Sequence, residues 1–236
     1  MSVYNKLIVP KHKRKYYIKG GFFYKSYRNK ALVKKEFLHA LRVFSVLKST
    51  FVRPLATENE YIKYPLLENF VTLKELLKTI AWYNHRYIII VASLWLAKLH
   101  RKSIIHGDFC IDNIGIQFLQ DRCEFKLIDA SFSFLCENEL DYSKDAQVCE
   151  LALFAFSYVM YITKFLFQLD LLSVYKMISN VRLFINSYFV YYGQKISKLT
   201  LRREILKVGI RGAKLFNKLN NYLSISLKIL ILEFIV

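Results

Sequence analysis

Glycine and proline are scarce in this chain, which has 7 Gly and 3 Pro among 236 residues. So few chain breakers argue against a linker-rich array of small domains. The chain also lacks the polar composition of disordered proteins. Of its residues, 54% are hydrophobic and 16% are aromatic, which argues against intrinsic disorder. The length suits one large domain or two lobes that share one cleft.

Long apolar runs and paired cysteine motifs are also missing. The longest apolar run, Leu151–Ile162, has twelve residues, fewer than the roughly 20 that span a bilayer, and it predicts a buried core helix. The first residues lack the apolar segment of a secretory signal. The four cysteines, Cys110, Cys123, Cys136 and Cys149, include no Cys-x-x-Cys pair, so we expect free thiols in a reducing cytoplasm.

Acidic residues are outnumbered, 18 against 36 Lys and Arg, and the formal net charge is +18. Residues 1–53 have 14 basic residues and one acid, Glu36, for a net +13, and residues 164–236 have 12 and 3, for a net +9. A basic surface favours an anionic partner, such as nucleic acid, an anionic membrane or a phosphorylated substrate. No RNA-recognition or helix-turn-helix signature supports nucleic acid. A solvated basic face is the alternative.

Hydrophobic periodicity predicts an α+β fold. Aromatic β-prone runs on both sides of Gly20-Gly21 predict a hairpin over residues 15–27, because both glycines can take positive φ. Apolar residues at helical spacing predict a helix over 31–47. Thr72 and Glu75 have the spacing of a capping box, which predicts a short helix there. Further strands are predicted at 51–55, 60–67, 104–105, 114–118 and 125–128, and further helices at 84–100 and after about Lys144.

These elements predict two parts, a β-rich lobe over residues 1–66 and a larger helical lobe over residues 67–236. Between the short strands of the second part, polar residues interrupt the apolar pattern. His106, Asp108, Asp112 and Asn113 fall within eight positions. The stretch is either a polar loop between strands or a catalytic loop.

Asp108, Asn113 and Asp129 together suit phosphoryl transfer. One aspartate can orient an acceptor hydroxyl and take its proton, while an amide and a second carboxylate hold Mg²⁺ through oxygen atoms. The sequence HGDFCIDN, followed by IDAS with Asp129 sixteen positions after Asn113, resembles the catalytic and metal loops of the protein-kinase-like superfamily. The resemblance covers roughly residues 15–160. It implies a two-lobed kinase-like fold with a reduced N-lobe, Asp108 as the catalytic residue, and Asn113 and Asp129 as ligands of Mg²⁺.

The same resemblance extends to the nucleotide site. It implies that Lys25 binds the phosphates of ATP and that Glu36, on the following helix, is its partner. Residues 64–69 resemble the hinge that holds adenine through backbone groups, which implies contacts at Pro65, Leu66 and Leu67. In the stretch SKDA, Asp145 occupies the position at which the family braces the catalytic loop. We interpret His106 as a packed residue rather than an acid or base, and Asp112 as a solvated carboxylate.

Within the superfamily, the small size, the IDAS motif and the basicity are most similar to lipopolysaccharide core kinases, in particular heptose kinases of the inner core. This resemblance implies transfer of phosphate from ATP to a sugar hydroxyl of an anionic glycolipid, at the inner face of the cytoplasmic membrane. One departure is the missing glycine-rich phosphate loop. The equivalent stretch is PKHKRK, Pro10–Lys15, whose basic side chains we expect to neutralise phosphate. A pseudokinase, or a kinase for protein or a soluble small molecule, is the alternative.

Overall fold

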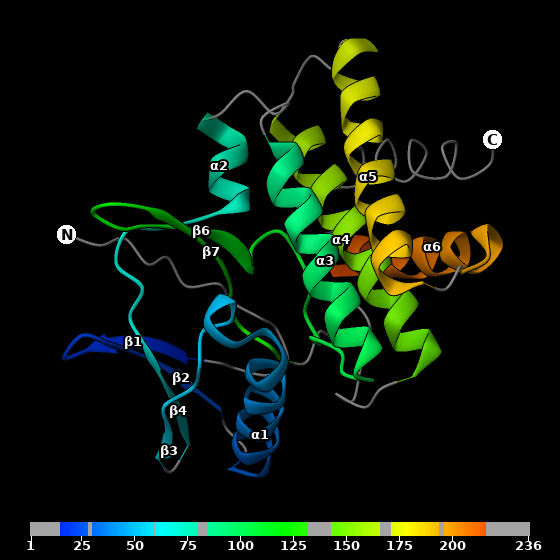
Figure 1. Ribbon diagram of the computed structural model, residues 1–236. Coiled ribbons are helices and arrows are strands. Elements are labelled where there is room, and N and C mark those ends of the chain that lie inside the picture. Colours follow the sequence, from blue (N-terminus) through cyan, green and yellow to red (C-terminus); the bar gives the residue numbers. More distant parts are fainter. Residues whose placement is uncertain are drawn as a thin grey trace.

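The computed structural model describes residues 15–27, 30–58, 60–79, 85–131, 143–165, 171–193 and 196–215. A small region with a sheet and one helix precedes a larger region of packed helices (Figure 1). The predicted α+β class, with the sheet-rich part at the N-terminal side, is confirmed.

The N-terminal sheet has four antiparallel strands in the order β1-β2-β4-β3. These are β1 (Lys15–Lys19), β2 (Phe22–Ser26), β3 (Ala56–Glu58) and β4 (Tyr61–Pro65). The predicted hairpin is confirmed, and Gly20 and Gly21 form its turn with φ of 57° and 75°. Helix α1 (Lys30–Leu47) follows β2, and it is drawn beside the sheet in Figure 1.

A second, three-stranded sheet has the order β5-β6-β7, with β5 (Phe70–Thr72), β6 (Ile114–Phe118) and β7 (Cys123–Leu127). The predicted strand at 51–55 is wrong: after a 3₁₀ turn at Lys48–Thr50, only Phe51 forms a bridge, to Leu127. The backbone N–H of Val52 donates to Leu127 O at 3.1 Å, and that of Leu55 donates to Lys63 O of β4 at 2.8 Å. This segment therefore contacts both sheets without forming a strand of either. Residues 104–105 form no strand either, because they lead directly into the polar loop.

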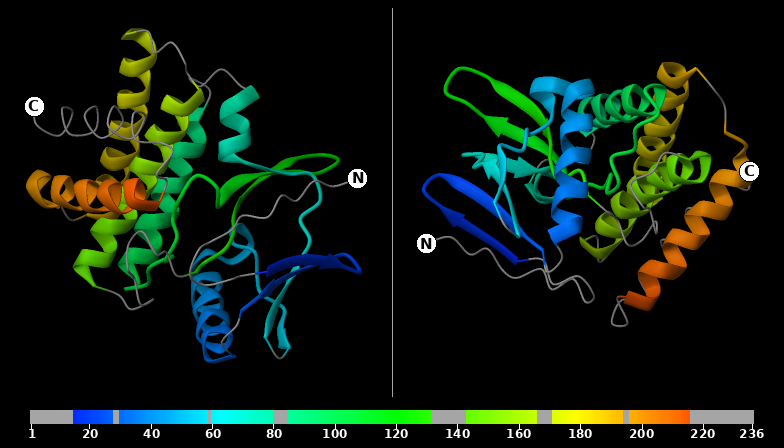
Figure 2. Two further views of the ribbon diagram at one scale, coloured as in Figure 1. Left: turned by 180° about the vertical axis from the view of Figure 1, so that it is seen from behind. Right: turned by 90° about the horizontal axis from the view of Figure 1, so that it is seen from below.

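The helices are α2 (Leu73–Thr79), α3 (Arg86–Arg101), α4 (Lys144–Phe165), α5 (Leu171–Tyr192) and α6 (Lys198–Leu215). The predicted capping box is confirmed, since Thr72 N donates to Glu75 Oε2 at 2.9 Å and Glu75 N donates to Thr72 Oγ1 at 3.2 Å. Helix α3 packs on α5, and α6 packs on α4. Figure 2 shows α6 lying across the more upright helices α4 and α5.

Two hydrophobic clusters meet at α1. The larger cluster fills the helical region and includes Ala40, Val43 and Leu47 of α1. The smaller cluster joins Val33 of α1 to Ile62 and Tyr64 of β4 and to other residues of the N-terminal region. Because α1 contributes to both, it connects the two parts of the chain rather than covering one sheet alone.

Helix α4 contains the longest apolar run of the sequence. Its stretch Lys144–Ile162 is the one helix among the described residues that is long and apolar enough to cross a membrane, and 89% of it is buried. The predicted core helix is therefore confirmed. Cys110 and Cys123 are free thiols, as predicted. Cys149 of α4 is disulfide-bonded, so the prediction of a free thiol is wrong for this residue.

Candidate active site

Lys25 lies at the centre of the candidate site and is 1% exposed. Its Nζ is 2.6 Å from Oε1 of Glu36 on α1. The same Nζ contacts the carboxylate of Asp129, 104 positions further along the chain. A buried ammonium group is unfavourable without anionic partners, and here two carboxylates supply them. The structure thus brings together three of the residues singled out in the sequence.

Helix α1 turns Glu36 inward because its buried positions follow helical spacing. Glu36 lies on the same side as Val33 and Ala40 and is 3% exposed. The hydroxyl of Tyr27 also donates to Glu36 Oε1, so this buried carboxylate has two donors. One ammonium and two carboxylates leave the Lys25–Glu36–Asp129 group with a net charge of −1, which suits an additional cation.

The loop that carries Asp108 is shaped by a glycine and an asparagine. Gly107 has a φ of 94°, a value that side chains disfavour, which explains glycine between His106 and Asp108. Asn113 Nδ2 donates to Asp108 O at 2.8 Å and to Asp108 Oδ2 at 3.2 Å. The backbone N–H of Ile128 donates to Asn113 O at 2.9 Å. Asn113 therefore links the Asp108 loop to the end of β7, next to Asp129.

Asp129 has an unusual backbone conformation. Its φ is 57°, in the left-handed region that costs a non-glycine residue about 1–2 kcal/mol, although aspartate tolerates it better than most. The side chain is 23% exposed, whereas that of Lys25 is 1% exposed. Residues with such backbone angles concentrate at functional sites. Here the contact of the Asp129 carboxylate with Lys25 offsets part of the cost of the left-handed conformation.

Glu150 of α4 holds the Asp108 loop from the helical side. Its Oε1 accepts the Gly107 N–H at 2.5 Å, and its Oε2 accepts the His106 N–H at 3.0 Å and lies 2.9 Å from His100 Nε2. The residue is fully buried. Burial alone would raise the pKa of Glu150, but the hydrogen bond and charge of His100, with the loop contacts, hold this pKa below its usual value. The carboxylate is therefore ionised and accepts three hydrogen bonds.

The prediction that Asp145 braces this loop is wrong. Asp145 is exposed in the first turn of α4, and the loop-facing position of the helix comes five residues later, at Glu150. A signal was present in the sequence, because Glu150 is the only charged residue between Ala146 and Ile162. An isolated carboxylate in an apolar helix indicates a buried partner.

The predicted packing of His106 and the solvated position of Asp112 are confirmed, but the ring nitrogens of His106 have no hydrogen-bond partner among the described residues. The ring of His106 packs edge-on against Phe51 and Phe109, with centroids 6.1 and 5.6 Å away. Burial lowers the pKa of His106 to about 4, so the ring is neutral and suits packing rather than proton transfer at neutral pH. Asp112 is exposed and pairs with Lys74 at 2.6 Å.

The predicted hinge residues differ in the backbone groups they can offer. Pro65 has no N–H, and the N–H of Leu66 donates to Gly21 O at 3.2 Å. Of the three residues, Leu67 is therefore the one whose backbone N–H is neither missing, as in Pro65, nor donated to Gly21, as in Leu66. Leu67 and Ile128 pack against the hydrophobic cluster that contains Tyr64, so the predicted hinge borders an apolar surface. An adenine ring is a suitable ligand for such a surface.

Mg²⁺ fits the oxygen atoms of the site. The amide nitrogen of Asn113 faces Asp108, which directs the amide oxygen elsewhere, and Asp129 supplies a partly exposed carboxylate. Across the part of the chain that the structure describes, no group of three or more His, Cys, Asp or Glu could hold a metal ion alone. Mg²⁺ commonly takes one or two protein ligands and completes its shell with phosphate and water, which is what this pair allows.

The predicted basic phosphate loop, Pro10–Lys15, lies outside the described residues except for Lys15 at the start of β1. No protein-family model matches the chain, and no curated protein is similar to it in sequence. Any assignment of function therefore depends on the geometry of the residues described above.

Proposed function

We propose that this protein is an ATP-dependent phosphotransferase with a protein-kinase-like fold, which phosphorylates a heptose hydroxyl of the lipopolysaccharide inner core. The observation that carries the proposal is the buried Lys25–Glu36 ion pair in contact with Asp129. Three distant segments converge there, and the next loop, with Asp108 and Asn113, is tied to the third of them. A buried structural ion pair alone would not need the adjacent polar loop.

Each residue has one role in the proposal. Lys25 binds the phosphates of ATP, and Glu36 keeps the ammonium group in position. Asn113 and Asp129 hold Mg²⁺, which neutralises charge on the transferring phosphoryl group. Asp108 orients the acceptor hydroxyl and takes its proton. Loss of such a base lowers the rate by about 10²–10⁴.

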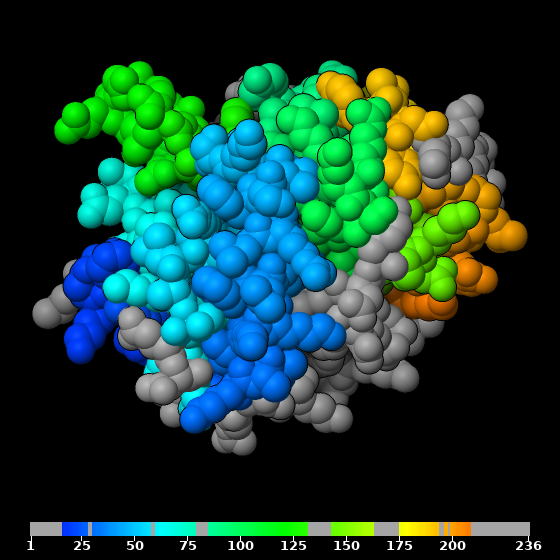
Figure 3. All heavy atoms as spheres, turned by 60° about the horizontal axis from the view of Figure 1, so that its bottom comes forward, coloured from blue at the N-terminus to red at the C-terminus, as the bar shows by residue number. Residues whose placement is uncertain are grey.

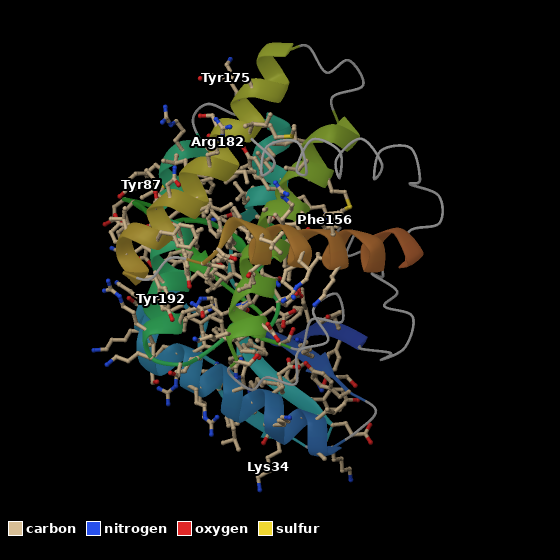
Figure 4. All side chains as sticks on the ribbon, turned by 90° about the vertical axis from the view of Figure 1, so that its right-hand side faces the viewer. Lys34, Tyr87, Phe156, Tyr175, Arg182 and Tyr192 are labelled. Carbon is tan, nitrogen blue, oxygen red and sulfur yellow. The ribbon has the colours of Figure 1, made fainter. Side chains whose placement is uncertain are left out.

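The acceptor part of the proposal is supported by charge on the outer face of α1. Glu36 is the only acid of this helix and faces inward, whereas Lys34, Lys35 and Arg42 are exposed. Leu38, which is 48% exposed, belongs to the same outer face. Figure 3 shows α1 across the middle of one face, and Figure 4 shows the Lys34 side chain projecting from the molecule. Cations around an exposed leucine suit an anionic lipid surface.

The enzymatic test is transfer of radiolabelled phosphate from ATP, with Mg²⁺, to lipopolysaccharide whose core phosphates have been removed. We expect transfer by the wild type and a loss of about 10²–10⁴ in kcat for Asp108→Asn. Asp112→Asn is the matched control, because it changes an exposed aspartate of the same loop. ATP binding without transfer to any acceptor would identify a pseudokinase. Transfer to a peptide or a soluble sugar alone would overturn the glycolipid acceptor and keep the phosphotransferase.

The membrane test is co-sedimentation with vesicles that contain anionic lipid. Each basic residue near such a surface contributes on the order of 1 kcal/mol, so Lys34→Glu, Lys35→Glu and Arg42→Glu together should weaken binding at least about 100-fold. The control reverses Arg86, Lys176 and Arg182; Figure 4 shows Arg182 far from Lys34. Equal losses in both triple variants would mean that net charge, not the face of α1, drives binding.

A further inference from the structure

His39 of α1 contacts the catalytic loop directly. It lies one turn after Glu36 and is 5% exposed. Its Nε2 is 3.2 Å from the backbone carbonyl oxygen of His106. One face of α1 therefore holds Lys25 through Glu36 and holds the Asp108 loop through His39, although these two groups belong to different parts of the chain.

The direction of this hydrogen bond follows from the chemistry of the two groups. Burial lowers the pKa of His39, and this outweighs the opposing effects of the His106 carbonyl and the charge of Glu150. The imidazole is therefore neutral and carries one N–H. A carbonyl oxygen can only accept, so the proton is on Nε2, which donates to His106 O.

The two backbone groups of His106 are thus held from opposite sides. Its N–H donates to Glu150 of α4 at 3.0 Å, and its carbonyl accepts from His39 of α1 at 3.2 Å. Asp108 follows two residues later. The position of its carboxylate depends on both anchors, and only the anchor at His39 also connects to the helix that positions Lys25.

We propose that His39 is a positioning residue that couples α1 to the catalytic loop, so that Lys25 and Asp108 are held at a fixed relative position. The proposal rests on the proposed phosphotransferase function for its consequence in catalysis. Loss of the hydrogen bond frees the loop on the α1 side. A displacement of about 1 Å at a reacting group lowers the rate roughly 100-fold.

The test compares His39→Leu with His39→Gln in the full chain. Leucine fills the buried volume without a donor, whereas the glutamine amide can place an N–H where Nε2 lies. We expect His39→Leu to lower kcat about 10–100-fold with little change in the KM for ATP, and His39→Gln to recover most of the loss. Leu32→Ala, at another exposed position of the same helix, is the control and should keep wild-type kinetics.

Hydrogen–deuterium exchange provides a readout that needs no catalysis. Backbone exchange across residues 103–113 should increase in His39→Leu and stay near the wild-type rate in His39→Gln. Unchanged exchange in the leucine variant would overturn the coupling, as would equal impairment of the two variants. A wild type without any transfer activity would refute the phosphotransferase instead, and the exchange data would still decide whether His39 holds the loop.

Discussion

Replacing Glu150 by glutamine tests how the Asp108 loop is held. The substitution keeps the size and shape of the side chain but exchanges one carboxylate oxygen for an NH₂ group. In the structure, Oε1 accepts one N–H and Oε2 accepts one backbone N–H and faces His100. An amide has one acceptor oxygen, so whichever way it turns, an NH₂ group faces at least one donor.

The expected loss of unfolding free energy follows from the amide orientation that keeps more of the hydrogen bonds. If the amide oxygen takes the place of Oε2, the contacts of His106 and His100 persist and the Gly107 N–H loses its acceptor. A hydrogen bond to a charged group is worth about 1.5–3 kcal/mol, and an unsatisfied buried donor costs about 1–3 kcal/mol. These two figures describe largely the same loss, so we expect the free energy of unfolding to fall by about 3 kcal/mol. In a chain of this size that lowers Tm by roughly 6–12 °C.

Urea denaturation at pH 7 measures this change, with Glu124→Gln as the control. Glu124 also has cationic partners, Arg122 and Lys126, but it lies at the surface, so its loss should be barely measurable. The folded-state pKa of Glu150 is lowered, so its contribution is present above the unfolded pKa of about 4.3 and is lost as the pH falls through the folded value. The difference between wild type and Glu150→Gln should shrink below about pH 4. Equal stability of the two proteins at pH 7 would refute the bracing role.

Two further predictions concern His106 and Gly115. The pKa of His106 is about 4 in the folded protein against 6.5 in the unfolded chain, so the unfolded state binds more protons between these pH values. Acidification from pH 6.5 to 4 should therefore lower the free energy of unfolding of the wild type by about 3 kcal/mol, a loss that His106→Leu does not show. Unfolding measurements at both pH values check this. A Cβ on Gly115 would lie 2.3 Å from Val71 O and 2.6 Å from the Phe70 ring, so Gly115→Ala should cost about 1–3 kcal/mol in thermal unfolding. A Gly115→Ala protein as stable as the wild type would contradict the packing described for β6.

Most long elements could be predicted from the sequence because each has its own repeating signal. The hairpin around Gly20-Gly21 needs two positive φ angles, and α1 and α4 are long enough for their apolar positions to be read. The strands β3 and β5 have three residues each, too few for an alternating pattern. Residues 51–55 resemble a strand in composition, but the parallel bridge of Phe51 to Leu127 is a long-range contact that local composition does not specify.

The site was predictable to a similar extent. Asp108 and Asn113 are five residues apart, and one loop brings them together. Lys25 and Glu36 came from the resemblance to a family. Asp129 was singled out by its chemistry, but nothing local indicates its contact with Lys25 across 104 positions. His39 and Glu150 were missed because they contact backbone atoms of a loop that is distant in the sequence: His39 contacts His106, 67 positions away, and Glu150 contacts His106 and Gly107, 44 and 43 positions away. Such contacts leave no periodicity, and only the isolation of Glu150 within an apolar helix could have revealed one of them.

In the proposed function and the further inference, the two sides of helix α1 have different tasks. Glu36 and His39 face inward and contact opposite halves of the candidate site, while Lys34, Lys35 and Arg42 are exposed on the outer side. Changes on the inner side should therefore alter turnover without altering vesicle binding, and changes on the outer side should do the reverse. Because Glu36 and His39 belong to the same helix, a force that shifts α1 through its outer side acts on Lys25 and on the Asp108 loop together.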